Sequence, residues 1–252
     1  MAVALVKLGP VDTSGLSPAF GQPTTAGDLL VAWLISSDSS ATDPFSTMSP
    51  GWSAAFTAGS SSQWTSVWYK PDCAAGETAP VFTSANGGPS LISMLGEFSG
   101  AALSSPVDSS GTSASPAAAC AAPDSAGGDL IIFSVCWNSG NGGGTITTTM
   151  TDSAGSAVTP GAADGVAGTS IYYDFAWGIA GAATGTGKDT AAGTLSVSGG
   201  AASGIVSFKA APAAPAFTFG TPYAGWNAGI PYTGWDAGTP YTGWSTGTPG
   251  TG

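Results

Sequence analysis

Residues 26–32 read Ala-Gly-Asp-Leu-Leu-Val-Ala and residues 127–133 read Gly-Gly-Asp-Leu-Ile-Ile-Phe, and these two stretches decide the fold. The run Leu29–Ile35 is continuously apolar, and Leu130–Trp137 is similarly rich in large apolar residues. A short apolar run of this kind favours a central strand covered on both faces. The repeated Gly-Asp-Leu start indicates that one structural unit occurs twice.

Two further motif pairs extend the duplication. Val67-Trp-Tyr resembles Ile171-Tyr-Tyr, and Leu91–Phe98 resembles Gly204–Phe208. The offsets within the three pairs are 101, 104 and 106–110 residues, a drift that loop lengths would produce. We therefore predict one body over residues 1–211, with similar halves at about 1–107 and 108–211. Two separate sandwiches are an alternative, but halves with so few large apolar residues favour a shared core.

The other strand signals predict an all-β fold, a jelly-roll-like antiparallel β-sandwich. Apolar and β-branched segments alternate with Gly-, Ser- and Pro-rich breaks, and none has a sustained helical period. The predicted strands are Leu29–Ile35, Trp64–Tyr69, Pro80–Thr83, Leu91–Phe98, Leu130–Trp137, Thr145–Thr151, Ser170–Trp177, Thr194–Ser198 and Ile205–Lys209. Several of the most buried side chains are expected among Leu29, Val31, Trp33, Leu130, Ile132, Leu195 and Val197.

Charge and hydropathy restrict the partners of the chain. The formal net charge is −11, with four Lys and neither Arg nor His. Without a basic patch, binding of nucleic acid or anionic lipid is disfavoured. The N-terminal apolar stretch is interrupted by Lys7 and stopped by Pro10, unlike a signal peptide. The longest apolar run is far shorter than the roughly 20 residues that span a bilayer. We predict synthesis in the cytoplasm and no membrane insertion.

Residues 212–252 form a tail with a different pattern. After the linker Pro212–Pro215, a nine-residue unit with one Tyr and one Trp begins at Gly220, Gly229 and Gly238, and a truncated copy begins at Gly247. Its Pro and Gly favour an extended chain or a series of turns. Tyr and Trp offer large contact area with few rotatable bonds, which suits interfaces. We therefore predict that the tail packs against another chain, with trimerisation as the preferred form. The predicted contact residues are Tyr223, Trp226, Tyr232, Trp235, Tyr241 and Trp244.

Two alternatives for the tail stay open. In the first, the tail is a flexible stalk with exposed aromatic rings. In the second, the tail binds a glycan, and each Trp stacks on one sugar ring.

The motifs that resemble catalytic sites are incomplete, so we predict that the chain is not an enzyme and has no catalytic, cofactor or metal residues. Gly243–Gly247 matches G-x-S-x-G around Ser245, but lacks the strand-to-helix context and a His to activate the serine. The loop Gly181–Thr190 resembles a phosphate loop but lacks its first Gly and its Ser/Thr. A glycosidase needs only two carboxylates, for which Glu77 and Glu97 are the weak candidates.

Three other features have two interpretations each. Loop Asp residues could bind calcium, but no EF-hand-like loop supports such a site. Six Trp residues lie in the body, where core packing is favoured over a sugar-binding platform. Cys136 lies in an apolar run and is expected to be buried and free, and a Cys120–Cys136 disulfide is the alternative. The body Trp residues are Trp33, Trp52, Trp64, Trp68, Trp137 and Trp177.

The order of motifs in the body resembles the minor tail proteins of actinobacterial phages and related surface proteins. The resemblance covers roughly residues 17–210. It is carried by Ala26–Ala32, Pro50-Gly-Trp, Val67-Trp-Tyr-Lys, Gly76-Glu-Thr-Ala-Pro-Val-Phe-Thr, Gly96-Glu-Phe-Ser-Gly-Ala, Pro106-Val-Asp and Gly127–Phe133. It implies a jelly-roll-like sandwich in a virion structural protein, brings no catalytic residues, and leaves the tail uncovered.

This resemblance gives the functional expectation. We expect a component of the tail tip or a fibre of a phage virion, acting in assembly and in attachment to the host surface. Its expected partners are other virion proteins, copies of itself and a host surface glycan. A capsid decoration protein and a carbohydrate-binding surface module are the alternatives.

Overall fold

The computed structural model describes residues 3–37, 43–60, 62–85, 90–123, 127–139, 144–167, 170–181 and 186–212. These residues form antiparallel strands and no helix, which confirms the all-β prediction. Across this described part, no helix is present that could cross a membrane. All of these residues belong to one compact unit, Met1–Ala214. The nonapeptide repeats belong to a second unit, Pro215–Gly252, and lie outside the described residues.

The first half contains one five-stranded sheet and one small sheet. The five strands are ordered β1-β7-β2-β5-β4, and β3 pairs with β6 in the small sheet. The strands are β1 (Ala4–Leu8), β2 (Leu29–Ser36), β3 (Phe45–Thr47), β4 (Ser53–Ser60), β5 (Gln63–Lys70), β6 (Phe82–Ser84) and β7 (Leu91–Ser99).

The second half repeats this arrangement. Its five-stranded sheet has the order β8-β16-β10-β14-β13, and its outer sheet has the order β12-β11-β15-β9. The strands are β8 (Val107–Ser113), β9 (Ala117–Ala119), β10 (Leu130–Asn138), β11 (Ile146–Thr151), β12 (Ala157–Val158), β13 (Gly161–Ala167), β14 (Ile171–Ile179), β15 (Thr190–Leu195) and β16 (Gly200–Phe208). The five strands of each large sheet therefore follow one another in the same order, as expected for a duplicated unit.

Local details repeat as well. The first strand of each half has an irregularity at the same place, between Leu5 and Lys7 in β1 and opposite Ser207 and Phe208 in β8. Gly27 and Gly128 of the two Gly-Asp-Leu motifs both have positive φ, 86° and 83°. This backbone conformation disfavours any side chain, which explains why each motif has glycine there.

The strand register corrects one of the proposed motif matches. Trp33 pairs with Val67 across β2 and β5, and its counterpart Ser134 pairs with Phe175 across β10 and β14. Val67 is therefore equivalent to Phe175. The match of Val67-Trp-Tyr with Ile171-Tyr-Tyr is wrong by four residues. Both segments are aromatic and β-branched, so their compositions are alike at either alignment.

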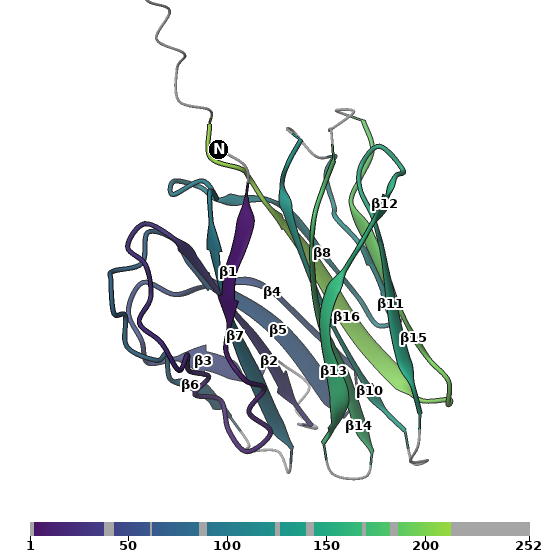
Figure 1. The fold of residues 1–252 in the computed structure, drawn as a ribbon. Helices are drawn as coiled ribbons and strands as arrows, with labels where there is room; N and C mark the ends of the chain where they lie inside the picture. The colour runs from purple at the N-terminus through teal and green to yellow at the C-terminus, as the bar shows by residue number, and fades with distance from the viewer. Residues whose placement is uncertain are drawn as a thin grey trace, which may run out of the picture. The chain divides into compact units, whose positions relative to one another are not determined.

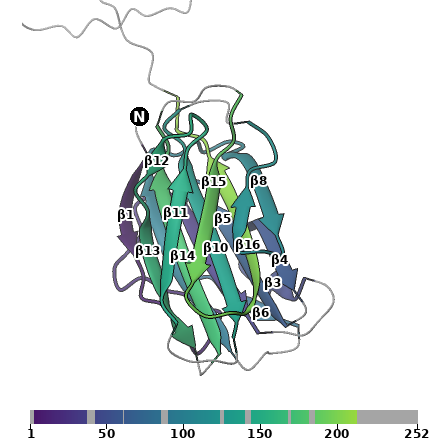
Figure 2. The same cartoon turned by 90° about the vertical axis from the view of Figure 1, so that its right-hand side faces the viewer.

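Four layers of sheet stack on one another (Figures 1 and 2). The two five-stranded sheets face each other across a central core that includes Trp33, Val67, Leu130 and Phe175. A second core separates β10, β14 and β16 from the outer four-stranded sheet. A third separates β2 and β7 from the β3–β6 pair and its flanking loops. The halves thus share a core, as predicted, and each also has a core of its own.

This stacking explains the continuous apolar runs. β2 and β10 lie at the centres of their sheets and contact a core on each face, so both odd and even positions are buried. Five of the side chains predicted as most buried have no exposed surface: Leu29, Val31, Trp33, Leu130 and Ile132. The other two, Leu195 and Val197, are only half-buried. β15 ends at Leu195, so both lie at the margin of the second core.

The two halves contribute side chains of different size to the shared core. Ser134 is the counterpart of Trp33, and Gly204, which pairs with Ser134, is the counterpart of Met94. A Cβ atom added to Gly204 would lie 2.2 Å from the ring of Phe56. Small residues of the second half therefore make room for large residues of the first half, so the two faces interdigitate rather than clash.

Candidate functional site

The structure places the two glutamates proposed for glycosidase chemistry on either side of the loop Thr24–Thr25. The Glu77 amide donates to the Thr24 hydroxyl over 2.7 Å, and the Thr25 amide donates to Glu97 Oε1 over 2.8 Å. Each glutamate is paired with a lysine: Glu77 with Lys70 at 2.7 Å, and Glu97 with Lys7 at 2.9 Å. Both carboxylates are therefore engaged inside the protein.

Glu97 is the more buried of the two and has a second acid beside it. Its side chain has no exposed surface, and Lys7 lies directly across from it in the β1–β7 ladder. Burial, together with the smaller effect of Glu97, raises the pKa of the neighbouring Asp28 to about 6. Burial opposes ionisation of Glu97 too, but hydrogen bonds from Lys7 and Thr25 hold its pKa below the usual value. One shared proton between Asp28 and Glu97 would relieve their repulsion.

The surroundings of this cluster offer little space for a substrate. A cavity of about 50 Å³ adjoins Glu77 and is lined by Phe20, Thr24, Leu30 and Leu95. A drug-sized ligand needs roughly 300 Å³ or more. In the second half, Ser109 and Ser207 take the places of Lys7 and Glu97 in the ladder. The Lys7–Glu97 pair thus has no counterpart at the same ladder position, although Asp108 of β8 pairs with Lys209 instead. The Lys7–Glu97 pair fastens the edge strand β1 to its sheet.

The other sequence candidates have these positions. No body Trp is exposed: Trp33, Trp52 and Trp137 are buried, and Trp64, Trp68 and Trp177 are half-buried. Within the described ranges, no group of three or more Cys, Asp or Glu side chains could hold a metal ion. Residues 182–185 of the loop Gly181–Thr190 lie outside the described residues, as do Ser245 and all six predicted tail contacts.

The three cysteines are buried and free. Cys120 belongs to the core between the second five-stranded sheet and its outer sheet, and Cys136 to the central core. They lie on opposite faces of that five-stranded sheet, so the proposed Cys120–Cys136 disulfide does not form. Burial raises the pKa of all three thiols, which keeps them in the unreactive protonated form.

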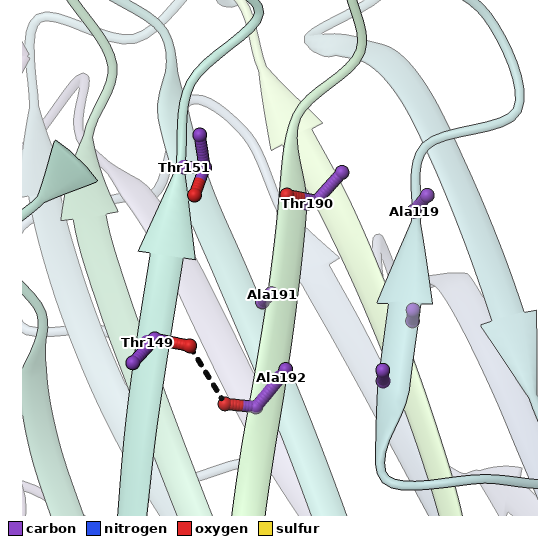
Figure 3. Close-up of a pocket in the computed structure, with 8 residues that line it drawn as sticks. Ala119, Thr149, Thr151, Thr190, Ala191 and Ala192 are labelled. Carbon is purple, nitrogen blue, oxygen red and sulfur yellow. Dashed lines mark hydrogen bonds between the residues drawn. The ribbon is translucent and has the colours of Figure 1, made fainter. Parts of the chain in front are cut away.

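One open surface that the sequence did not predict is the outer face of the four-stranded sheet. The ladder aligns Thr147 with Thr194, Thr149 with Ala192, and Thr151 with Thr190. On β9, Ala117 and Ala119 continue the rows of Ala192 and Thr190. A hollow of about 440 Å³ lies on this face (Figure 3), and every residue that lines it is Ala or Thr.

No family model, no curated protein and no solved structure matches the chain. The residues of the body are therefore interpreted from their own geometry.

The Ala/Thr face differs chemically from an active site. It carries no charged side chain on its outward rows, and the Thr149 hydroxyl donates to the Ala192 carbonyl over 3.4 Å (Figure 3). Beneath this face, Asp174 of β14 accepts a hydrogen bond from the hydroxyl of Thr148, on the inner side of β11. Burial raises the pKa of Asp174 to about 6, and the Thr148 bond opposes that rise. A shallow, neutral surface of small side chains suits contact with another macromolecule.

Proposed function

We propose that the chain is a non-enzymatic structural component of a phage virion, at the tail tip or in a fibre. The observation that carries this proposal is that the carboxylates considered for catalysis are paired with lysines, and that the open hollow has no ionisable side chain. Its buried or half-buried carboxylates Glu77, Glu97 and Asp108 form ion pairs with Lys70, Lys7 and Lys209. The hollow on the four-stranded sheet is lined only by Ala and Thr.

The architecture supports the same proposal. Fusing two β-sandwiches through a central core yields a wide body without an internal hinge, since the large sheets interdigitate. Such a body suits a load-bearing spacer. The order of its motifs resembles that of actinobacterial phage minor tail proteins, as the sequence indicates. The tail then serves as the proposed assembly element, and copies of the chain and other virion proteins are its partners.

Localisation in particles tests this proposal directly. Particles from a culture that produces the chain are banded in a density gradient and labelled with gold-conjugated antibody against the purified chain. We expect the chain to band with the particles and the label to lie on the tail tip or fibres. Label over the capsid would overturn the tail assignment in favour of a decoration protein. Label on cell walls with none on particles would overturn the virion proposal in favour of a surface module.

A turnover assay tests the non-enzymatic part. We expect no release of reducing sugar when the full chain is incubated with a panel of bacterial cell-wall polysaccharides. Turnover by the native chain that disappears in Glu77→Gln would contradict the proposal. The exposed-loop variant Gly21→Ala is the matched control, because nothing lies near the added methyl group.

A further inference from the structure

One outer face of the body carries two exposed apolar side chains, and the opposite outer face carries the Ala/Thr hollow. On the first half, Met48 and Val81 extend the β3–β6 ladder by one pair, with the Met48 amide donating to the Val81 carbonyl over 3.1 Å. Side chains alternate along a strand, so both project outward together with Ser46 and Thr83. Met48 is 77% exposed and Val81 41% exposed. The opposite end of the layer stack carries the Ala/Thr hollow of about 440 Å³.

The exposure of Met48 marks a candidate contact surface. Among the large apolar side chains of the described ranges, Met48 is the most exposed, and the next is Val166 at 48%. A flexible thioether adapts to shallow, small-residue surfaces, and Met is enriched at interfaces. The hollow offers such a surface, since the outward residues Ala117, Ala119 and Ala192 that line it carry only methyl groups.

Charge is complementary as well. Lys7, Lys70 and Lys209 form ion pairs inside the body, whereas Lys188 forms none with the described residues and is exposed. It lies two residues before Thr190, at the rim of the Ala/Thr hollow. Asp43 is exposed and lies two residues before β3, at the rim of the Met48 face. In a chain of net charge −11, a second copy approaches most easily where a free cation meets an acid.

The spans of the two rims agree. Five residues of extended chain separate Asp43 from Met48, which is roughly 16 Å. Lys188 lies four residues from Ala192, roughly 13 Å of extended chain, and its side chain extends the reach of its charge outward. One docking pose can therefore seat Met48 in the hollow and bring Asp43 near Lys188.

We propose that the Met48 face of one copy docks into the Ala/Thr hollow of a second copy. The two surfaces lie on opposite outer layers of the body, so the contact is heterologous and joins copies head to tail. It produces an open row, or a ring where the rotation closes. This contact lies between bodies and does not depend on the virion proposal or on the tail.

The contact is expected to be weak on its own. Two strands of six residues and two short strands of two and three residues present a face of roughly 270 Å². A standard interface buries about 800 Å² on each partner. Association should therefore rise with protein concentration, and copies already held side by side in an assembly should show it most.

Disulfide trapping between full-length variants tests the pose. Met48→Cys and Ala192→Cys are prepared separately, mixed under mild oxidation, and compared with the control mixture of Val166→Cys and Ala192→Cys. The three native cysteines are buried and do not compete. We expect at least tenfold more mixed dimer, identified by mass, from the Met48 pair than from the Val166 pair. Equal yields from the two mixtures would overturn the proposal.

A charge exchange gives an independent test. In sedimentation velocity, Met48→Lys should reduce concentration-dependent association, and Val166→Lys should leave it unchanged. Adding Ala192→Glu to Met48→Lys should restore association, because the new ammonium and carboxylate meet in the hollow. Near-ultraviolet circular dichroism checks that each variant keeps the native fold. Unchanged association of Met48→Lys, or a double variant no better than the single one, would overturn the proposal.

Discussion

The indole Nε1 of Trp33 donates a hydrogen bond to the backbone carbonyl of Phe133 over 3.2 Å, across the interface between the two halves. The same indole lies 6.2–6.4 Å, between ring centroids, from Phe98, Phe175 and Trp177. A second polar link, between the hydroxyls of Thr65 and Ser134 at 2.5 Å, lies in the same core. Trp33 therefore fixes how the two sheets are placed against each other, besides filling the space between them.

Truncating Trp33 should destabilise the whole body rather than one half. We expect Trp33→Ala to lower the free energy of unfolding by about 3–5 kcal/mol, because a large buried ring is removed. Trp33→Phe should lower it by less, through loss of the bond to Phe133 and some volume. Urea unfolding monitors both variants. Trp177→Phe is the control, since this half-buried ring belongs to the same cluster, and an equal loss in Trp177→Phe would contradict the role of the hydrogen bond.

The fit of the halves predicts intolerance at Gly204. We expect Gly204→Ala to reduce stability by about 1–3 kcal/mol, because its methyl group would meet the Phe56 ring at 2.2 Å. Gly21→Ala is the matched control, with nothing within 4 Å of the added atom. Combining Gly204→Ala with Phe56→Leu should recover part of the loss. Thermal unfolding in which the two alanine variants melt together would contradict the tight fit.

The buried ion pair on β1 gives a prediction about charge. We expect Lys7→Met to lower stability by about 3 kcal/mol, since it leaves the fully buried Glu97 beside Asp28 without its cation. The double variant Lys7→Met with Glu97→Gln should be more stable than Lys7→Met alone. Lys70→Met is the comparison, because its partner Glu77 keeps some exposure and can be solvated. Denaturant midpoints of the four proteins measure these differences.

Stability should increase as the pH falls from 7 to 5. Burial raises the pKa of Asp28 and Asp174 from 3.8 to about 6 in the folded chain. In that window the folded state binds protons that the unfolded state releases. The stabilisation is complete below pH 3.8 and is lost as the pH rises through about 6. The slope should reach up to about 1.4 kcal/mol per pH unit for each group.

Two variants separate these contributions. Asp174→Asn should remove its part of the slope between pH 5 and 7, and Thr148→Val should steepen it, since the Thr148 bond favours the ionised form. Denaturant titrations at half-unit pH intervals provide the measurement. A native chain whose stability is flat or rises toward pH 7 would contradict the assignment.

The tail remains the predicted assembly element. Replacing Trp226, Trp235 and Trp244 with Ala in the full chain should lower its oligomeric state, because each ring would otherwise bury a large area in the interface. Light scattering coupled to size exclusion measures the mass, and Thr233→Ala with Thr242→Ala is the control. A chain ending at residue 215 should behave like the Trp variant. Unchanged mass in both would show the tail to be a stalk. The Met48–Ala192 cross-link should persist in either case.

The sequence by itself determined the all-β class and the duplicated central strands. β2 and β10 could be predicted because a strand covered on both faces is apolar at most positions, and these runs are too short for a typical helix. Their shared Gly-Asp-Leu start has a local cause, the positive φ of Gly27 and Gly128. The aromatic strands β5 and β14 were visible for the same reason, since large side chains mark the core directly.

Only the tertiary structure decided the rest. β4, β8 and β13 are built mainly of Ala, Gly, Ser and Thr, which carry no strand signal of their own, and are strands because their neighbours supply the hydrogen bonds. The pairing of Lys7 with Glu97 joins residues from strands far apart in the chain. The Ala/Thr hollow and the exposed Met48 become surfaces only when the four layers are stacked. Small side chains do not specify their own exposure, because what covers them is set by packing elsewhere in the fold.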